Sequence, residues 1–403
     1  MVLRFAWLSL WRRPLRYGIL LLLTAIACAL PVFVIQLAGG LYQGLNRAAA
    51  PFPVLAGAKG SPYQLVLNTV FLQDRPIGNI PYSEVEALRQ SGRASQVLPL
   101  AFGDSYRGFR LCGAEKDIFT YQVPGESHPW LKPAQGRGFT DEGEAVLGAD
   151  TARLTGLKLG DTFQSNHGFI AKGKAHNHPY KVVGILEPVH GPYDKSILVP
   201  LGDIWEAHQG HGEALQPGQK GDVTAILVRP TGYGQAMQLL AAWQRKKGGP
   251  SQLIFPAQSL IALYGMVGQS RQFWMLITGG LLAAATLVTL LALYWDGTSR
   301  MEEWALLRAL GADLSRIQKI LLVEQFLLLA MGSGLGWLLG WGGSALAAAG
   351  IGQHAAVEIS RLPLWQGGSG PGAPDRSGNR RGDDSPVAAP EKGYCPLSVR
   401  GML

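Results

Sequence analysis

The chain has 403 residues, of which 47% are hydrophobic and only 16% charged, and its mean hydropathy is +0.11. It is too apolar for an ordinary soluble protein and not apolar enough to lie mostly in a membrane, so we expect a few spans and a large soluble domain. The net charge of +8 does not indicate nucleic acid as a partner, because no basic patch is interleaved with aromatic residues. The three cysteines, Cys28, Cys112 and Cys395, lack the spacing of a disulfide framework or a zinc site.

The N-terminal segment is basic and then apolar. Four arginines lie among the first 16 residues, and an uncharged run follows from Tyr17 to Asn46. This pattern predicts an interfacial helix over residues 1–16 and a first membrane span over 17–41, with the N-terminus in the cytoplasm. A cleaved signal peptide is the main alternative, but the apolar run is too long for one.

Residues 47–271 contain no run long enough to cross a bilayer, and turn residues occur throughout. We therefore predict one large extracytoplasmic domain over this range. Local periodicity predicts a mixed α/β fold, with strands over residues 180–186, 196–200 and 223–228 and helices over 83–90 and 234–244.

No catalytic motif occurs in the chain. G-x-S-x-G, H-E-x-x-H and the phosphate loop G-x-x-x-x-G-K-[ST] are all absent, so we expect no enzyme activity here and any ATPase on another polypeptide. Six of the eight histidines fall between His167 and His211. His176 and His178 would share one face of a strand, and His208 and His211 would be neighbours on a helix, so either pair could bind zinc. Solvated loop histidines are the simpler alternative.

A second uncharged run, from residue 272 to 295, predicts a second span that returns the chain to the cytoplasm. The following segment, 296–319, is then cytoplasmic, in agreement with its basic residues. Within it, Ser299 and Glu302 have the spacing of a capping box, and a helix is predicted from Arg300 to Leu310. At about 1.5 Å per residue this helix is too short to cross a bilayer but suits the groove of a partner, with its charged residues, Arg300 included, in water. A plain loop between spans is the alternative.

A third span is predicted over residues 320–351, because no Asp, Glu, Lys or Arg occurs from 325 to 357. The carboxylate of Glu324 lies near one end and is expected to reach the membrane interface. Three glycines, Gly332, Gly336 and Gly340, fall four residues apart and form a smooth strip that lets another helix approach closely. We see no evident partner for this strip within the chain, which favours a dimer. A buried helix of a soluble protein is the alternative, but the length argues against it.

The segment MEEWALLRALGADLSRIQKILLVEQ, residues 301–325, resembles the core signature of the FtsX-like, or MacB-type, permeases of ABC transporters. Its marks are an acidic pair, an apolar stretch that ends in Arg-Ala-Leu-Gly-Ala, and a helix that carries Glu. Residues 135–163, QGRGFTDEGEAVLGADTARLTGLKLGDTF, followed by YKVVGIL, are similar to the periplasmic core of the same family.

The resemblance implies a multi-pass permease subunit of a bacterial cytoplasmic (inner) membrane, with a fourth span beyond the three recognised here. It implies that ATP and Mg are bound by a separate cytoplasmic ATPase subunit, that permeases form homo- or hetero-dimers in membrane lipid, and that the cargo is a lipoprotein, peptide or similar molecule. The residues that it assigns to coupling with the ATPase are Glu302, Glu303, Trp304, Leu307, Arg308, Leu310 and Gly311. A membrane-anchored sensor or adaptor that binds a ligand or metal outside, without transport, is the alternative function.

Residues 366–403 do not fit the family. They are rich in Gly, Pro, Arg and Asp, which predicts disorder, and no span can be drawn through them. A shifted reading frame after codon 355 to 365 would explain the missing fourth span. A natural extension on a three-span variant is the alternative.

Overall fold

The computed structural model describes residues 7, 8, 11, 12, 14–168, 175–208, 220–246, 248–260, 276, 279–284, 286, 287, 289–291, 294, 295, 297–311 and 313–354. The predicted tail, 366–403, and any fourth span lie outside these residues. So does much of the predicted second span, although its described residues between Gly279 and Leu291 are helical.

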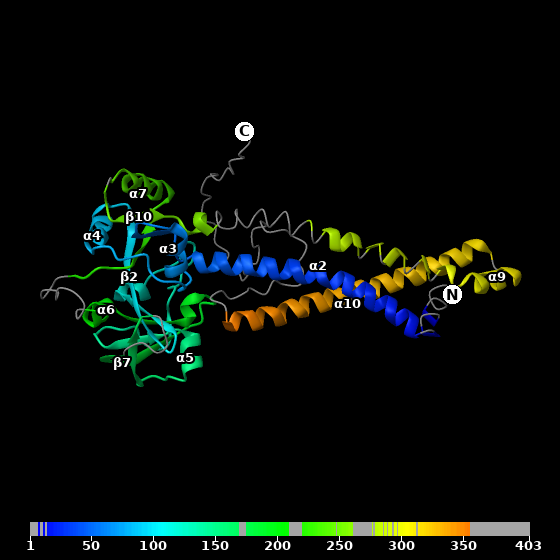
Figure 1. The fold of residues 1–403 in the computed structure, drawn as a ribbon, viewed down its shortest axis with the longest axis horizontal. Coiled ribbons are helices and arrows are strands. Elements are labelled where there is room, and N and C mark those ends of the chain that lie inside the picture. Colours follow the sequence, from blue (N-terminus) through cyan, green and yellow to red (C-terminus); the bar gives the residue numbers. More distant parts are fainter. Residues whose placement is uncertain are drawn as a thin grey trace, which may run out of the picture. The chain divides into compact units, whose positions relative to one another are not determined.

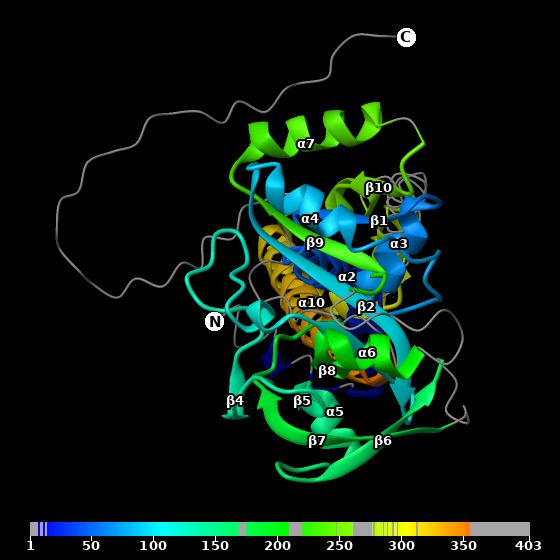
Figure 2. The same ribbon diagram turned by 90° about the vertical axis from the view of Figure 1, so that its left-hand side faces the viewer.

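A mixed sheet of ten strands forms the centre of the α/β domain (Figure 2). The strands are β1 Val54–Ala58, β2 Ala94–Tyr106, β3 Phe109–Ala114, β4 Pro133–Gly136, β5 Glu144–Leu147, β6 Thr162–His167, β7 Ala175–Leu186, β8 Ser196–Pro200, β9 Ala225–Pro230 and β10 Ser251–Ile254. Their order is β10-β1-β9-β2-β3-β8-β5-β7-β4, and β6 pairs with both β7 and β2. Strands β2, β3, β8, β5, β7 and β6 therefore pair in a closed ring.

Both faces of the sheet are buried, because apolar side chains alternate between two hydrophobic clusters. In β8, Ile197 and Val199 belong to one cluster and Leu198 to the other. In β9, Leu227 belongs to the same cluster as Leu198, and its two chain neighbours belong to the cluster of Ile197. Successive side chains of a strand point to opposite faces, so these short apolar runs produce a sheet that helices must cover on both sides.

Short helices cover the sheet, and the predicted mixed α/β fold is confirmed. They are α3 Pro62–Thr69, α4 Ser83–Gln90, α5 Ala149–Thr155, α6 Leu201–His208 and α7 Tyr233–Arg245, with single 3-10 turns at η1 Lys116–Phe119 and η2 Pro192–Lys195. Helix α4 contributes Val85 and Leu88 to the cluster that contains Ile197, and α3 contributes Leu65 to the opposite cluster. The predicted helix over 83–90 has the bounds of α4.

Two helices, α2 Pro14–Ala49 and α10 Leu314–His354, flank the domain in sequence and are long and apolar enough to cross a membrane (Figure 1). With 36 and 41 residues, they are about 54 and 62 Å long at 1.5 Å per residue, well beyond the ~30 Å of a hydrocarbon core. Helix α10 begins six residues before the predicted third span and so includes the end of the predicted cytoplasmic segment. A short helix, α9 Met301–Ala309, precedes it.

Candidate coupling site

Helix α9 begins and ends without side-chain caps. The predicted capping box is wrong: Arg300 is the N-cap residue, and no side chain caps this end of the helix. The Ser299 hydroxyl instead accepts a hydrogen bond from the Arg16 guanidinium, at the start of α2. Gly311 follows the helix with a φ of +89°, a left-handed conformation that glycine adopts without strain.

The two sides of α9 differ in exposure. Trp304 and Leu307 are half-buried, whereas Met301, Leu306 and Leu310 are 66%, 66% and 78% exposed. The sequence-predicted set therefore spans both sides of the helix. That set omits Leu306. Leu306 lies on the opposite side of the helix from Trp304, so its side chain is exposed when Trp304 faces inward. Of the charged members of that set, the side chains of Glu302 and Arg308 are exposed, and that of Glu303 is not described.

A buried ion pair joins α9 to the two long helices. Nη1 of Arg300 lies 3.0 and 2.9 Å from the two carboxylate oxygens of Glu324, in α10. The same nitrogen donates to the hydroxyl of Tyr17, in α2, at 2.9 Å, and that hydroxyl donates to Glu324. Arg300, Glu324 and Tyr17 are only 6%, 1% and 5% exposed.

Two predictions are corrected by this cluster. Arg300 is not in water, and the Glu324 carboxylate is enclosed by protein rather than exposed, because each neutralises the other inside the protein. An unpaired charge in an apolar environment is very costly, and removing one partner of a buried pair costs about 3–5 kcal/mol. The pair therefore fixes the start of α9 against both α2 and α10.

The three glycines at four-residue spacing pack against α2. A Cβ atom on Gly336 would lie 2.4 Å from the carbonyl oxygen of Ala25, and one on Gly340 would lie 2.6 Å from that of Ala29. On Gly332 it would meet Thr24 at 2.7 Å. The prediction that this strip lacks a partner within the chain is wrong, because the partner is the first long helix. The strip is therefore no argument for a dimer.

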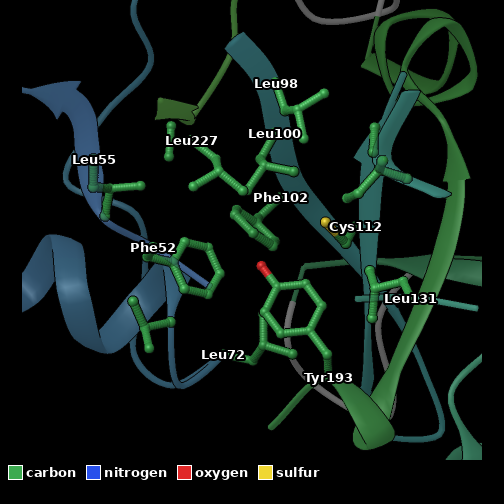
Figure 3. Packing of buried hydrophobic residues seen from close by; sticks show 14 of the residues in the cluster. Phe52, Leu55, Leu72, Leu98, Leu100, Phe102, Cys112, Leu131, Tyr193 and Leu227 are labelled. Carbon is green, nitrogen blue, oxygen red and sulfur yellow. The ribbon is translucent and has the colours of Figure 1, made fainter. Parts of the chain in front are cut away.

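The other end of α2 enters the core of the α/β domain. Ala48 and Ala49, at the end of the helix, and Phe52 belong to the same hydrophobic cluster as Leu55 of β1 (Figure 3). The carbonyl of Pro51 accepts a hydrogen bond of 2.6 Å from a buried tyrosine hydroxyl. No flexible linker separates the helix from the sheet here.

Aromatic rings surround this junction. The ring of Phe52 packs against those of Trp130 and Tyr193, at 5.4 and 5.8 Å between centroids. The hydroxyl that holds Pro51 belongs to Tyr121, and burial raises the pKa of Tyr121 above its usual value, so the hydroxyl stays protonated and donates. Aromatic pairs of this kind stabilise the junction beyond the area that they bury.

The predicted zinc-binding histidines lie largely outside the described residues. His176 and His178 lie in β7 and His208 ends α6, but their side chains, and the whole of His211, lie outside what is described. The zinc site therefore stays a prediction. Carboxylate oxygens of Glu142, Asp203 and Glu206 lie within 4.8 Å of one another, with Asp203 buried and the two glutamates exposed, and an acidic group of this kind does not by itself indicate a metal.

The family assignment follows from two sequence matches. Residues 21–242, more than half of the chain, match the MacB-like periplasmic core domain, and residues 275–365 match the FtsX-like permease C-terminal domain. The chain belongs to the FtsX/MacB-type permeases. It is therefore a membrane permease subunit of an ABC transporter. The family, together with the apolar helices of this chain, indicates a bacterial inner membrane. The family implies association with a cytoplasmic ATPase subunit.

Two solved structures are similar to parts of this permease. The periplasmic region of MacB from Actinobacillus actinomycetemcomitans is 14% identical, with a TM-score of 0.36, over 54% of this chain and 95% of that one. The extracellular domain of the noncanonic ABC-type transporter YknZ from Gram-positive bacteria is 15% identical, with a TM-score of 0.32, over 50% and 98%. No curated protein matches the permease sequence.

Proposed function

We propose that this permease receives movement from its ATPase at α9 and passes that movement along α2 and α10 to the extracytoplasmic domain. The observation that carries the proposal is the continuity of α2. It is tied at Tyr17 to the start of α9, and it ends at Ala49, inside the core of the α/β domain.

Such a helix suits the transmission of force. Pro31 removes one backbone hydrogen bond inside α2, but the contacts of Gly340 with Ala29 and Val32 hold the helix against α10 on both sides of that residue. Displacement of one packed helix against another is a common form of conformational change. The close contacts between Gly336 and Ala25 leave little space for α2 to move independently of α10. A push at the α9 end would therefore reach the sheet with little loss.

The exposed side of α9 suits contact with the ATPase. Leu306 and Leu310 lie four residues apart, so they share one side of a short helix and give it an exposed apolar surface, which fits the groove of a protein partner. With α9 at the cytoplasmic side, the N-terminus is also cytoplasmic and the α/β domain is outside. The cargo that we propose is a lipoprotein, a peptide or a similar molecule that the extracytoplasmic domain exports or releases, and a second permease copy would use surfaces other than the glycine strip.

The test is the charge variant Leu306→Glu. Placing a carboxylate in an apolar contact should cost about 2–4 kcal/mol of association, which is a loss of roughly 30-fold or more in affinity. We expect the ATPase that co-purifies with the full wild-type chain from its native membrane to be lost. The control is Gln318→Glu, which adds the same charge at an exposed position early in α10 but off α9.

Two results would contradict the proposal. Unchanged co-purification and ATP turnover with Leu306→Glu would remove α9 as the contact. Absence of any ATPase from the wild-type preparation would favour the alternative of a membrane-anchored sensor or adaptor.

A further inference from the structure

The buried cluster of Arg300, Glu324 and Tyr17 lies where three segments meet, and each segment contributes one side chain. Tyr17 is in the first turn of α2, Arg300 is the residue before α9, and Glu324 lies three turns into α10. We infer that the Arg300–Glu324 pair, held by Tyr17, is a joint between the three helices. When α9 moves, this joint makes α2 and α10 move with it. This inference rests on the proposed function, and it makes these three side chains positioning residues in coupling.

The geometry of these contacts restricts how α9 can move relative to α2 and α10. One nitrogen of Arg300 contacts both carboxylate oxygens of Glu324 and the hydroxyl of Tyr17, so α9 cannot shift or rotate without lengthening at least one of these bonds. A second tie lies next to it, between Arg16 and Ser299. Two adjacent residues of α2 are thus bonded to two adjacent residues before α9.

Stability alone is a poor explanation for this choice of residues. Well-packed apolar side chains of similar volume usually stabilise a protein as well as or better than a buried ion pair does. One and two turns after Glu324 in α10, Leu328 and Gly332 are buried and form a stripe of apolar and small residues. An apolar side chain at Glu324 would continue that stripe, but it would allow α9 to slide. Directional hydrogen bonds hold one arrangement, as polar groups do when they set register in helix assemblies.

Trp304 reinforces the joint from α9 itself. Its ring lies 4.7 Å from the Arg300 guanidinium carbon, a contact in which the ring face attracts the cation. Its buried indole nitrogen has no hydrogen-bond partner among the described residues, although buried tryptophan nitrogens usually have one. The contact with Arg300 links the joint to the body of α9.

The experiment compares hydrogen–deuterium exchange in the purified complex of the full chain with its co-purifying ATPase, with ADP and with ATP plus vanadate. The readout is the exchange of residues 45–72, where α2 enters the domain. We expect wild type to show a nucleotide-dependent difference in this segment. Glu324→Gln should keep the ATPase bound but lose most of the difference, and the exchange of charges, Arg300→Glu with Glu324→Arg, should restore part of it.

Tyr17→Phe supplies a milder variant that removes one hydroxyl and keeps the ion pair, so it remains informative where Glu324→Gln does not fold. We expect it to reduce the nucleotide-dependent difference. A full wild-type difference in Tyr17→Phe and in any Glu324→Gln that folds would overturn the joint while leaving the proposed function standing. Absence of the difference in wild type would instead count against the proposed function, and the joint would then have no movement to transmit.

Discussion

Replacement of Gly336 by alanine should separate α2 from α10, and the structure indicates by how much. The new Cβ would lie 2.4 Å from the Ala25 carbonyl oxygen and 2.8 Å from Cβ of Cys28, whereas ordinary contact begins near 3.4 Å. The backbone oxygen cannot rotate away, so the helices must move apart by about 1 Å. Gly332 and Gly340 make equally close contacts on the same stripe and would be loosened with it.

The magnitude follows from two opposing terms. Overpacking of this kind typically costs about 1–3 kcal/mol, and alanine in place of glycine favours a helix by about 0.8–1.0 kcal/mol. The matched control is Gly334→Ala, where a Cβ would meet nothing within 4 Å. The propensity term is the same in both variants, so the difference between Gly336→Ala and Gly334→Ala isolates the packing term, which we expect to be ~1–3 kcal/mol.

The assay is reversible unfolding of the purified full chain in mixed detergent micelles, followed by tryptophan fluorescence. Gly334→Ala should be as stable as wild type or slightly more stable, and Gly336→Ala should be less stable than Gly334→Ala. Equal stability of the two variants would refute the close packing of α2 on the glycine strip.

Three further predictions concern other parts of the chain. The Arg137 side chain, which donates to Glu144 at 2.8 Å, and the backbone N–H groups of Thr140 and Asp141 lower the pKa of Glu144 from 4.5 to about 2. These bonds should therefore stabilise the domain above pH 4.5 and lose their contribution as the pH falls toward 2. Acid unfolding of Glu144→Gln should show a weaker pH dependence than wild type, and identical profiles would argue against this contribution. Zinc titration of the full chain should show saturable micromolar binding that His176→Ala with His178→Ala removes, and equal binding by both proteins would exclude the histidine site. Translation of the other two frames downstream of codon 355 to 365 should reveal about 20 apolar residues followed by a basic end, and the absence of such a run in both frames would leave the three-span interpretation.

Local periodicity predicts those helices and strands whose own sequence shows which side chains are buried. The amphipathic segment Ser83–Gln90 forms α4 with its predicted ends, and the apolar run Ser196–Pro200 forms β8. Pairing between distant strands was not predictable in this way. Strand β6 reaches β2 through the pair Asp104 and His167, 63 residues apart, and nothing in the local pattern of either strand specifies that neighbour.

The coupling site likewise has features that its local sequence predicts and contacts between distant segments that it does not. Spacing alone predicts the glycine strip, but its partner depends on the small residues of α2, such as Ala25, and the spacing within α10 does not identify them. A lone carboxylate in an apolar helix was a usable signal, since such a residue generally has a partner inside the protein. The partners of Glu324 are not evident from the sequence, because Arg300 and Tyr17 come close to it only once three separate segments have packed.

The proposed function depends on the transmission of movement by α2 from the ATPase side of the membrane into the extracytoplasmic domain. The most direct test is hydrogen–deuterium exchange over residues 54–254 in the complete complex, with ADP and with ATP plus vanadate, for wild type and for a variant with Gly-Gly-Ser inserted after Tyr42. The insertion breaks the rigid helix between its contacts with α10 and its end in the domain core. We predict a nucleotide-dependent difference in wild type that the insertion abolishes while ATP turnover continues. The same difference in both proteins would show that movement reaches the domain by another route and would contradict the account.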